Sequence, residues 1–123
     1  MKRNKAYIPH LNLLVIRTQN PEALKEQYEE LGFQFQYHQH GKGPFHYAHE
    51  EEDFVFEIYP LKQQQEKADD SLRLGFAVKE LDNTLEKLRQ SNWKILSETK
   101  EKEWGKVAII QDLDGRKIEL KEA

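Results

Sequence analysis

Two glutamates stand at matching places in a sequence pattern that occurs twice. Glu57 and Glu119, 62 positions apart, each lie between two large apolar residues. A carboxylate at such a position in a strand faces away from the side on which its neighbours pack. It can then serve as a general base or as a metal ligand. A repeat this long in a short chain bounds the fold and indicates where a ligand could sit.

The segments before the two glutamates correspond piece by piece. An apolar strand leads into an amphipathic helix, a bulky aromatic residue and a hairpin whose last strand carries the glutamate. The predicted first strands are His10 to Ile16 and Arg73 to Val78, and the predicted helices are Pro21 to Leu31 and Leu81 to Ser91. Each half is therefore strand, helix and three strands. Neither half could bury its helix and sheet alone, so we expect the two to pack together.

Local signals set the boundaries of these elements. Asn20 can cap the first helix and Pro21 suits its first position. The almost unbroken aliphatic run Leu11 to Ile16 is typical of a strand covered on both sides. We expect the polar segment Ser97 to Glu103 to form a loop, and the segment Asp112 to Gly115 to turn the closing hairpin.

Composition narrows the class of protein. The 123 residues suit one domain, residues 1–123, and the net charge is about −3 with both signs interspersed. The basic residues form no stripe, which argues against nucleic acid as a partner. No apolar run is long enough to span a membrane and no signal peptide is visible, so we expect a cytoplasmic protein. The chain has no cysteine, which excludes disulfides and thiolate chemistry.

The order of elements resembles the vicinal oxygen chelate superfamily. Leu31-Gly32-Phe33 after the first helix, and Asp112-Leu113-Asp114-Gly115 before Ile118-Glu119-Leu120, carry the resemblance, which covers residues 8–121. The superfamily includes glyoxalase I, extradiol dioxygenases, and bleomycin and fosfomycin resistance proteins. The resemblance implies an α+β fold of two βαβββ modules, residues 8–60 and 72–121, joined by a connection, residues 61–71. The modules would form a curved, open eight-stranded barrel around a cavity.

Metal-dependent members of that superfamily hold a divalent ion with residues from the first and last strands of each module. Carried across, the four positions fall near His10, Glu57, Arg73 and Glu119. The guanidinium of Arg73 cannot ligate a cation and would repel it. Two alternatives follow: His10, Glu57 and Glu119 hold one divalent metal (Zn, Ni, Mn or Fe), or Arg73 neutralises the carboxylates without a metal. We favour the second.

Four histidines cluster in the first half: His38, His40, His46 and His49. Their spacing matches no helical zinc motif, so exposed or hydrogen-bonded roles are the default. His46 is the exception of interest. If Phe45 and Tyr47 pack toward the helix, His46 points into the cavity beside Glu57.

The leading hypothesis is a glyoxalase-like protein that binds a small polar organic ligand in the cavity. The predicted ligand-binding residues are His10, Asn12, His46, Tyr59, Arg73 and, at the rim, Trp104. If it is an enzyme, a lyase or isomerase step is expected, with Glu57 or Glu119 as general base and a metal or Arg73 stabilising the enolate oxygen.

The alternative is a non-catalytic protein that sequesters a drug or metabolite, as bleomycin resistance proteins do. The resemblance also implies a homodimer. Pairing of the modules within one chain and pairing between two chains both remain open.

Overall fold

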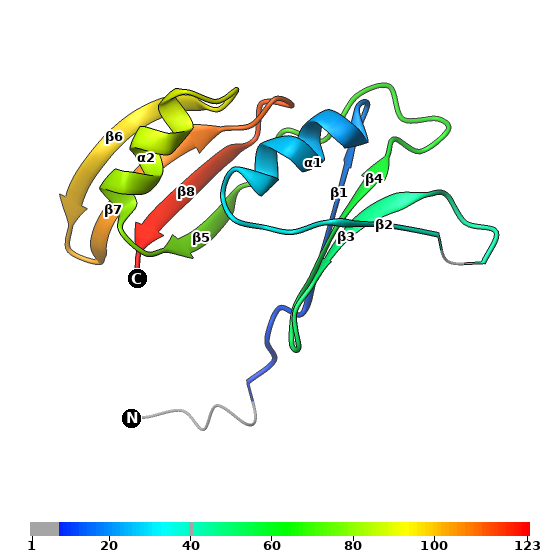
Figure 1. The fold of residues 1–123 in the computed structure, drawn as a ribbon, viewed down its shortest axis with the longest axis horizontal. Coiled ribbons are helices and arrows are strands. Elements are labelled where there is room, and N and C mark those ends of the chain that lie inside the picture. Colours follow the sequence, from blue (N-terminus) through cyan, green and yellow to red (C-terminus); the bar gives the residue numbers. More distant parts are fainter. Residues whose placement is uncertain (1–7, 40) are drawn as a thin grey trace.

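The computed structural model describes residues 8–39 and 41–123 and contains the predicted order of elements twice (Figure 1). The α+β fold of two βαβββ modules is confirmed. The first module consists of β1 (Leu13–Thr18), α1 (Pro21–Glu29), β2 (Gln36–His38), β3 (His46–Glu50) and β4 (Val55–Pro60). The second consists of β5 (Leu74–Val78), α2 (Leu81–Arg89), β6 (Lys94–Lys102), β7 (Gly105–Gln111) and β8 (Lys117–Glu122).

Each module forms its own four-stranded sheet. The strand order is β1-β4-β3-β2 in the first sheet and β5-β8-β7-β6 in the second. The first and last strands of each module pair in parallel, and all other pairs are antiparallel. The two modules lie side by side with their sheets open, as expected for a curved, open barrel (Figure 1).

The two helices are capped in different ways. Asn20 caps α1 as predicted, because its side-chain oxygen accepts a hydrogen bond of 3.1 Å from the amide three residues on. Before α2, Glu80 adopts a left-handed conformation with φ 51° and gives no side-chain cap. Instead, the Leu81 amide donates to Oε1 of Glu122, at 2.9 Å. The start of α2 is therefore tied to the end of β8.

β1 is displaced along the chain from its predicted position. It starts at Leu13 rather than His10, because its parallel partner β4 begins only at Val55. It then continues through Thr18, which lies opposite Pro60. The predicted boundaries were therefore wrong at both ends, since the partner strand and not the aliphatic run sets the length of β1.

The polar segment predicted as a loop is part of a strand. β6 continues through it and pairs with β7 as far as Lys102 opposite Gly105, with shifts of register on either side of Ser97. β6 lies at the edge of its sheet. Edge strands carry charged side chains that discourage pairing with other chains. The loop prediction was wrong because such a strand need not show apolar alternation.

The hydrophobic core is shared by both modules. The buried Tyr28 ring of α1 packs edge-on against Trp93 of the second module, with centroids 5.1 Å apart. Phe76 of β5 packs against Phe33 at 5.1 Å and against Tyr28 at 6.4 Å. Edge-to-face aromatic pairs of this kind add to the burial of apolar area. The two modules therefore share one hydrophobic core.

Gln27 of α1 forms a polar contact with the second module, which we call the Gln27 seam. Its side-chain amide donates to the Asn92 carbonyl at 3.3 Å, and its side-chain oxygen accepts from the Leu113 amide at 2.8 Å. Its backbone carbonyl accepts from the Trp93 indole N–H at 2.8 Å. Each buried polar group of Gln27 thus has a partner across the boundary.

The predicted turn at Asp112 to Gly115 is present and anchors a second cross-module contact. The Asp112 carboxylate accepts a hydrogen bond of 2.8 Å from the Tyr28 hydroxyl. It also accepts from the buried guanidinium of Arg116, at 3.2 Å. Arg116 in turn donates to the Arg17 carbonyl at 2.6 Å. Burial and the neighbouring Asp112 carboxylate raise the pKa of Tyr28 well above its ordinary value.

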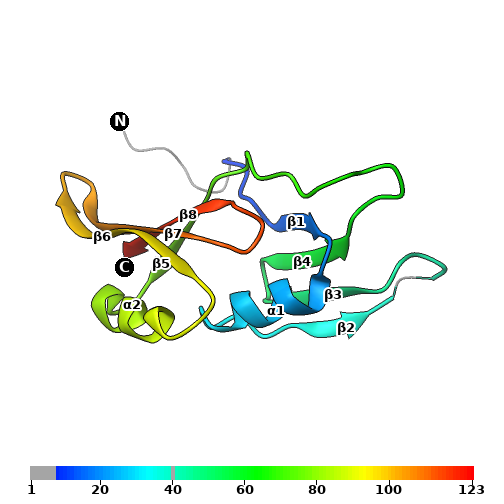
Figure 2. The same cartoon turned by 90° about the horizontal axis from the view of Figure 1, so that it is seen from above.

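One face of each sheet carries no helix. The connection between modules runs on the side of the molecule opposite the two helices (Figure 2). Along β1 and just before it, Leu11, Leu13 and Val15 are 72%, 50% and 38% exposed. The sequence predicts cover on both sides of this run, whereas one side is open in a single chain. None of the described helices is long and apolar enough to cross a membrane.

Candidate functional site

The open face of the first sheet holds Glu57 and His46. In the strand register Glu57 lies opposite Val15 of β1 and Ala48 of β3. His46 lies two residues before Ala48 on β3 and therefore shares this face. The expectation that His46 points to the side of Glu57 is confirmed, since its Nε2 atom is 3.1 Å from Oε2 of Glu57.

The polar groups of His46 restrict where its protons lie. Its Nδ1 atom is 3.3 Å from the Pro44 carbonyl, which can only accept a hydrogen bond. Nδ1 therefore carries a proton in this contact. Nε2 faces the Glu57 carboxylate, which is likewise an acceptor. The ring is 1% exposed, which holds it firmly in this position.

Two further side chains extend the group across the face. The Tyr59 ring stacks on the His46 ring, with centroids 4.2 Å apart and an interplanar angle of 6°. The Arg17 guanidinium lies over the Tyr59 ring, 4.9 Å from its centroid. Arg17 also donates to the Pro60 carbonyl at 3.1 Å. We call Arg17, Tyr59, His46 and Glu57 the first-face group.

Tyr59 is kept in its neutral form by its surroundings. Desolvation raises the pKa of its hydroxyl, the Glu57 carboxylate raises it further, and the Arg17 cation opposes both. A neutral phenol can donate a hydrogen bond. The first-face group therefore offers a cation, a hydroxyl donor and a carboxylate along one side of the sheet.

The second glutamate lies on a different face. Glu119 lies opposite Gly75 of β5 and Ile109 of β7, on the second sheet. Gly75 has no side chain to cover it. Arg73 precedes β5 and is exposed. Lys117 and Lys121 have the same parity on β8 as Glu119, so the open face of the second sheet is rich in cations.

The remaining predicted residues lie apart from the first-face group. His10 and Asn12 precede β1 and line a depression with the acidic turn at Glu52 and Asp53. Trp104 lies in the β6–β7 turn and is 57% exposed. The alternation of residues along the sequence did not reveal that His10 and Asn12 lie apart from the first-face group. The register of β1, which decides this, depends on its partner strand.

The ligand set that the fold family implies for a metal does not assemble in one described chain. Within residues 8–39 and 41–123, no three His, Cys, Asp or Glu side chains are grouped to hold a metal ion. The first-strand residues opposite Glu57 and Glu119 are Val15 and Gly75, neither of which offers a ligand atom. The donor set of His10, Glu57 and Glu119 therefore does not fit a metal within a single chain.

The histidine cluster is dispersed into separate contacts. Nε2 of His38 is 3.6 Å from Glu50, and Nε2 of His49 is 2.8 Å from Glu51. His40 lies outside the described residues. His38 and His49 thus lie against separate glutamates, as His46 lies against Glu57.

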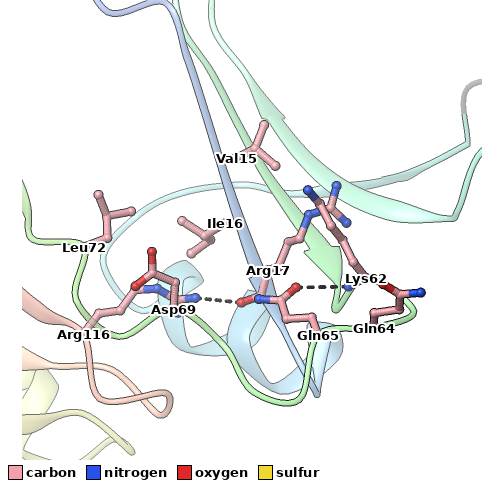
Figure 3. Close-up of a pocket in the computed structure, with 9 residues that line it drawn as sticks. All are labelled: Val15, Ile16, Arg17, Lys62, Gln64, Gln65, Asp69, Leu72 and Arg116. Carbon is pink, nitrogen blue, oxygen red and sulfur yellow. Dashed lines mark hydrogen bonds between the residues drawn. The ribbon is translucent and has the colours of Figure 1, made fainter.

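A pocket of about 450 Å³ lies beside the first-face group, between β1, the connection and the β7–β8 turn (Figure 3). The pocket is lined by Val15, Ile16, Arg17, Lys62, Gln64, Gln65, Asp69, Leu72 and Arg116. None of these was among the predicted site residues. The sequence carried a weak signal for one of them, because Arg17 has the parity of Val15 and Leu13 on the face that β1 leaves open.

The family of the chain follows from a match over almost its whole length. A family model described as a glyoxalase-like domain matches residues 13–123. The chain belongs to this family. The match supports the resemblance to the vicinal oxygen chelate superfamily drawn from the sequence. No curated protein matches the chain.

Solved structures share the fold at low sequence identity. TnmS3, an antibiotic binding protein from Streptomyces sp. CB03234, is 22% identical with a TM-score of 0.73, over 94% of this chain and 97% of that one. A glyoxalase-related enzyme from Fulvimarina pelagi is 16% identical with a TM-score of 0.71, over 94% and 89%. The hypothetical protein SA1046 from S. aureus is 15% identical with a TM-score of 0.70, over 95% and 99%.

Proposed function

We propose that this glyoxalase-like protein binds a small polar organic molecule in the pocket beside the first-face group and sequesters it. The observation that carries the proposal is the pocket of about 450 Å³, whose lining includes Arg17, the guanidinium that lies over the Tyr59 ring. Ligand sites typically combine a concave, largely apolar wall with a few fixed polar groups. Val15 and Leu72 supply the apolar wall, and Arg17 supplies a fixed cation.

Sequestration is supported by the arrangement of the donor groups. The carboxylates and imidazole that would hold a metal do not converge in one chain, so the polar groups beside the pocket are suited to hydrogen bonding and charge pairing. A protein of similar fold, TnmS3, is described as an antibiotic binding protein. Binding without turnover requires only such contacts.

Catalysis is the second candidate, and the contact between His46 and Glu57 favours it. In this alternative Glu57 removes a proton from the carbon next to a ligand carbonyl. The hydroxyl of Tyr59 and the guanidinium of Arg17 then stabilise the enolate oxygen. This would be a lyase or isomerase step of the kind expected for a glyoxalase-related enzyme. Glu119 would take part only if a second chain brought it to this face.

Thermal denaturation with a panel of small polar organic compounds tests the binding function. A true ligand at ~100 times its Kd should stabilise the native state by about 2.7 kcal/mol and raise Tm by several degrees. Zn, Ni, Mn or Fe added to chelated protein should give no shift in Tm. If no compound of the panel raises Tm, the binding proposal is wrong.

A Glu57→Gln variant separates the two candidate functions. If the protein sequesters its ligand, the variant should still bind it, because the amide fills the same space. If the protein is an enzyme, the variant should bind but lose turnover by at least ~100-fold, since the base is missing. Turnover of a bound compound by the wild-type protein would contradict pure sequestration.

We also propose that the protein forms a homodimer through its open faces. The exposed Leu11 and Leu13 form an apolar strip at the start of β1, outside the lining of the pocket. Contiguous apolar surface of this kind is typical of interfaces. A second copy is the partner that the family resemblance implies.

Light scattering on the eluted protein tests the dimer. A Leu13→Glu variant should elute as a monomer because the charge disrupts the apolar strip. Leu113→Glu is the matched control, since Leu113 is 44% exposed but lies in the β7–β8 turn. A monomeric wild-type protein at micromolar concentration would contradict the proposal.

A further inference from the structure

The side chains that line the pocket beside β1 differ in chemistry from one side to the other, and this difference narrows the class of molecule that can bind. Figure 3 shows Arg17, Lys62 and two glutamines on one side, and Asp69, Leu72 and Arg116 on the other. The side chains come from three places that are far apart in sequence: β1, the connection and the β7–β8 turn. The walls are thus held by the fold and not by one local segment.

Arg116 contributes a buried donor without a partner. Its Nη1 atom donates to Asp112 and Asp114, and its Nη2 atom donates to the Arg17 carbonyl. Its Nε atom has no hydrogen-bond partner among the described residues, although the side chain is only 1% exposed. A buried N–H without an acceptor is destabilising. Since Arg116 lines the pocket, an acceptor atom on a ligand would satisfy this group.

Arg17 and Lys62 contribute positive charge. In the described part of the chain, neither has a carboxylate within 4.0 Å, whereas the two carboxylates at Arg116 neutralise that guanidinium. The Arg17 guanidinium is held in place by the Tyr59 ring and the Pro60 carbonyl. A preorganised cation of this kind binds a carboxylate with charge-assisted hydrogen bonds.

Asp69 limits how much negative charge the pocket accepts. Its carboxylate accepts from the amide and the hydroxyl of Ser71, at 2.9 and 2.6 Å, and these bonds lower its pKa. It therefore stays ionised at neutral pH and repels a second anionic group at its end of the pocket. Arg17 and Lys62 thus face the pocket as two cations without carboxylate partners within 4.0 Å among the described residues, and Asp69 is the carboxylate that lines it.

We propose that the pocket binds a small organic monocarboxylate, with the carboxylate at Arg17 and Lys62 and the apolar body against Val15 and Leu72. A second acceptor atom of the ligand pairs with Nε of Arg116. This inference rests on the proposed binding function and names the class of molecule that the site takes. It excludes multiply charged anions such as phosphate as good ligands.

Titration calorimetry with 2-naphthoate tests the inference, with its neutral analogue 2-naphthamide and inorganic phosphate as comparisons. 2-Naphthoate should bind saturably, one per chain, and at least ~10-fold more tightly than the amide or phosphate. Its affinity should fall as salt is raised. Arg17→Gln and Lys62→Gln should each weaken it by about fivefold or more.

Lys67→Gln is the matched control, because Lys67 lies on the same connection but does not line the pocket. It should bind 2-naphthoate as the wild type does, and all three variants should keep the wild-type Tm. Equal binding of the acid and the amide would overturn the inference, and so would equal affinities of the Lys62 and Lys67 variants.

The compound panel distinguishes failure of this inference from failure of the proposed function. If neutral or cationic compounds raise Tm and 2-naphthoate does not bind, the monocarboxylate inference is wrong and the binding function stands. If neither 2-naphthoate nor any compound of the panel binds, both are wrong.

Discussion

The two modules share one scaffold but carry different chemistry on their open faces. On the first sheet, Glu57 lies with a stacked histidine, tyrosine and arginine beside a pocket. On the second sheet, Glu119 lies opposite Gly75, with lysines on the same strand face. The turns before the last strands differ as well. In the first module this turn is exposed and acidic, whereas in the second Asp112 is buried and joins the modules. The two modules therefore share a scaffold, while the polar groups beside the pocket lie on the first sheet and the buried charged turn lies in the second module.

The largest expected effect comes from the buried turn. Asp112→Ala removes the acceptor of the Tyr28 hydroxyl and leaves the Arg116 guanidinium without one of its two carboxylates. Breaking a buried charge pair in this way should lower the free energy of unfolding by about 3–5 kcal/mol, measured by urea denaturation. Asp53→Ala, in the exposed turn of the first module, should change it by no more than about 0.5 kcal/mol. Equal losses in the two variants would remove the contrast between the turns.

An intermediate effect is expected at the two tryptophans. Trp93→Phe keeps an aromatic ring in the core but leaves the Gln27 carbonyl without its indole donor. The free energy of unfolding should fall by roughly 1–3 kcal/mol. Trp104→Phe, at an exposed position of the same module, should be within about 0.5 kcal/mol of the wild type. A neutral Trp93→Phe variant would show that the indole bond of the Gln27 seam adds nothing to stability.

The buried phenol of Tyr28 should make stability depend on alkaline pH. Its pKa is higher in the folded protein than in the unfolded chain, so its contribution is complete below about pH 10 and is lost as pH rises toward the folded value. The wild type should lose up to about 1.4 kcal/mol per pH unit in this range through Tyr28. Tyr28→Phe should lack this part of the slope, whereas Tyr37→Phe, at a position 61% exposed, should keep it. Parallel pH profiles of the two variants would contradict the assignment.

The smallest effect concerns the two glutamates themselves. Glu57→Gln removes a negative charge near Tyr59 and Arg17, and should tighten binding of 2-naphthoate by up to about fivefold. Glu119→Gln should leave the affinity within about twofold if the first face alone forms the site. Titration of both variants gives the comparison directly. A large change for Glu119→Gln would mean that a second chain brings this residue to the pocket.

Much of the fold could be predicted because its signals are local. Asn20 and Pro21 mark the start of α1, and the Asp112 turn lies where its residue types indicate. The contact of His46 with Glu57 also followed from alternation along one strand. The part of β6 from Ser97 to Lys102 was missed because an edge strand need not alternate.

The pocket could not be predicted because its parts meet only in three dimensions. Arg116 reaches the Arg17 carbonyl across 99 positions, and Arg17 reaches the Pro60 carbonyl across 43. The sequence indicates only that residues 61–71 connect the two modules, yet Lys62 and Asp69 of this connection line the pocket. Periodicity assigns a side chain to a face, but it does not show which distant segment passes over that face.

The Gln27 seam has a consequence for how the two halves can be exchanged. Hydrophobic surfaces tolerate sliding, but the three hydrogen bonds of Gln27 point in fixed directions to Asn92, Leu113 and Trp93. A chain that traded its second module with a neighbour would have to rebuild the same three bonds with the neighbour's residues. In the first module expressed alone, the side-chain amide and the backbone carbonyl of Gln27 would lose their hydrogen-bond partners in the second module. The hydrogen bonds of this one glutamine therefore favour a single arrangement of the two halves.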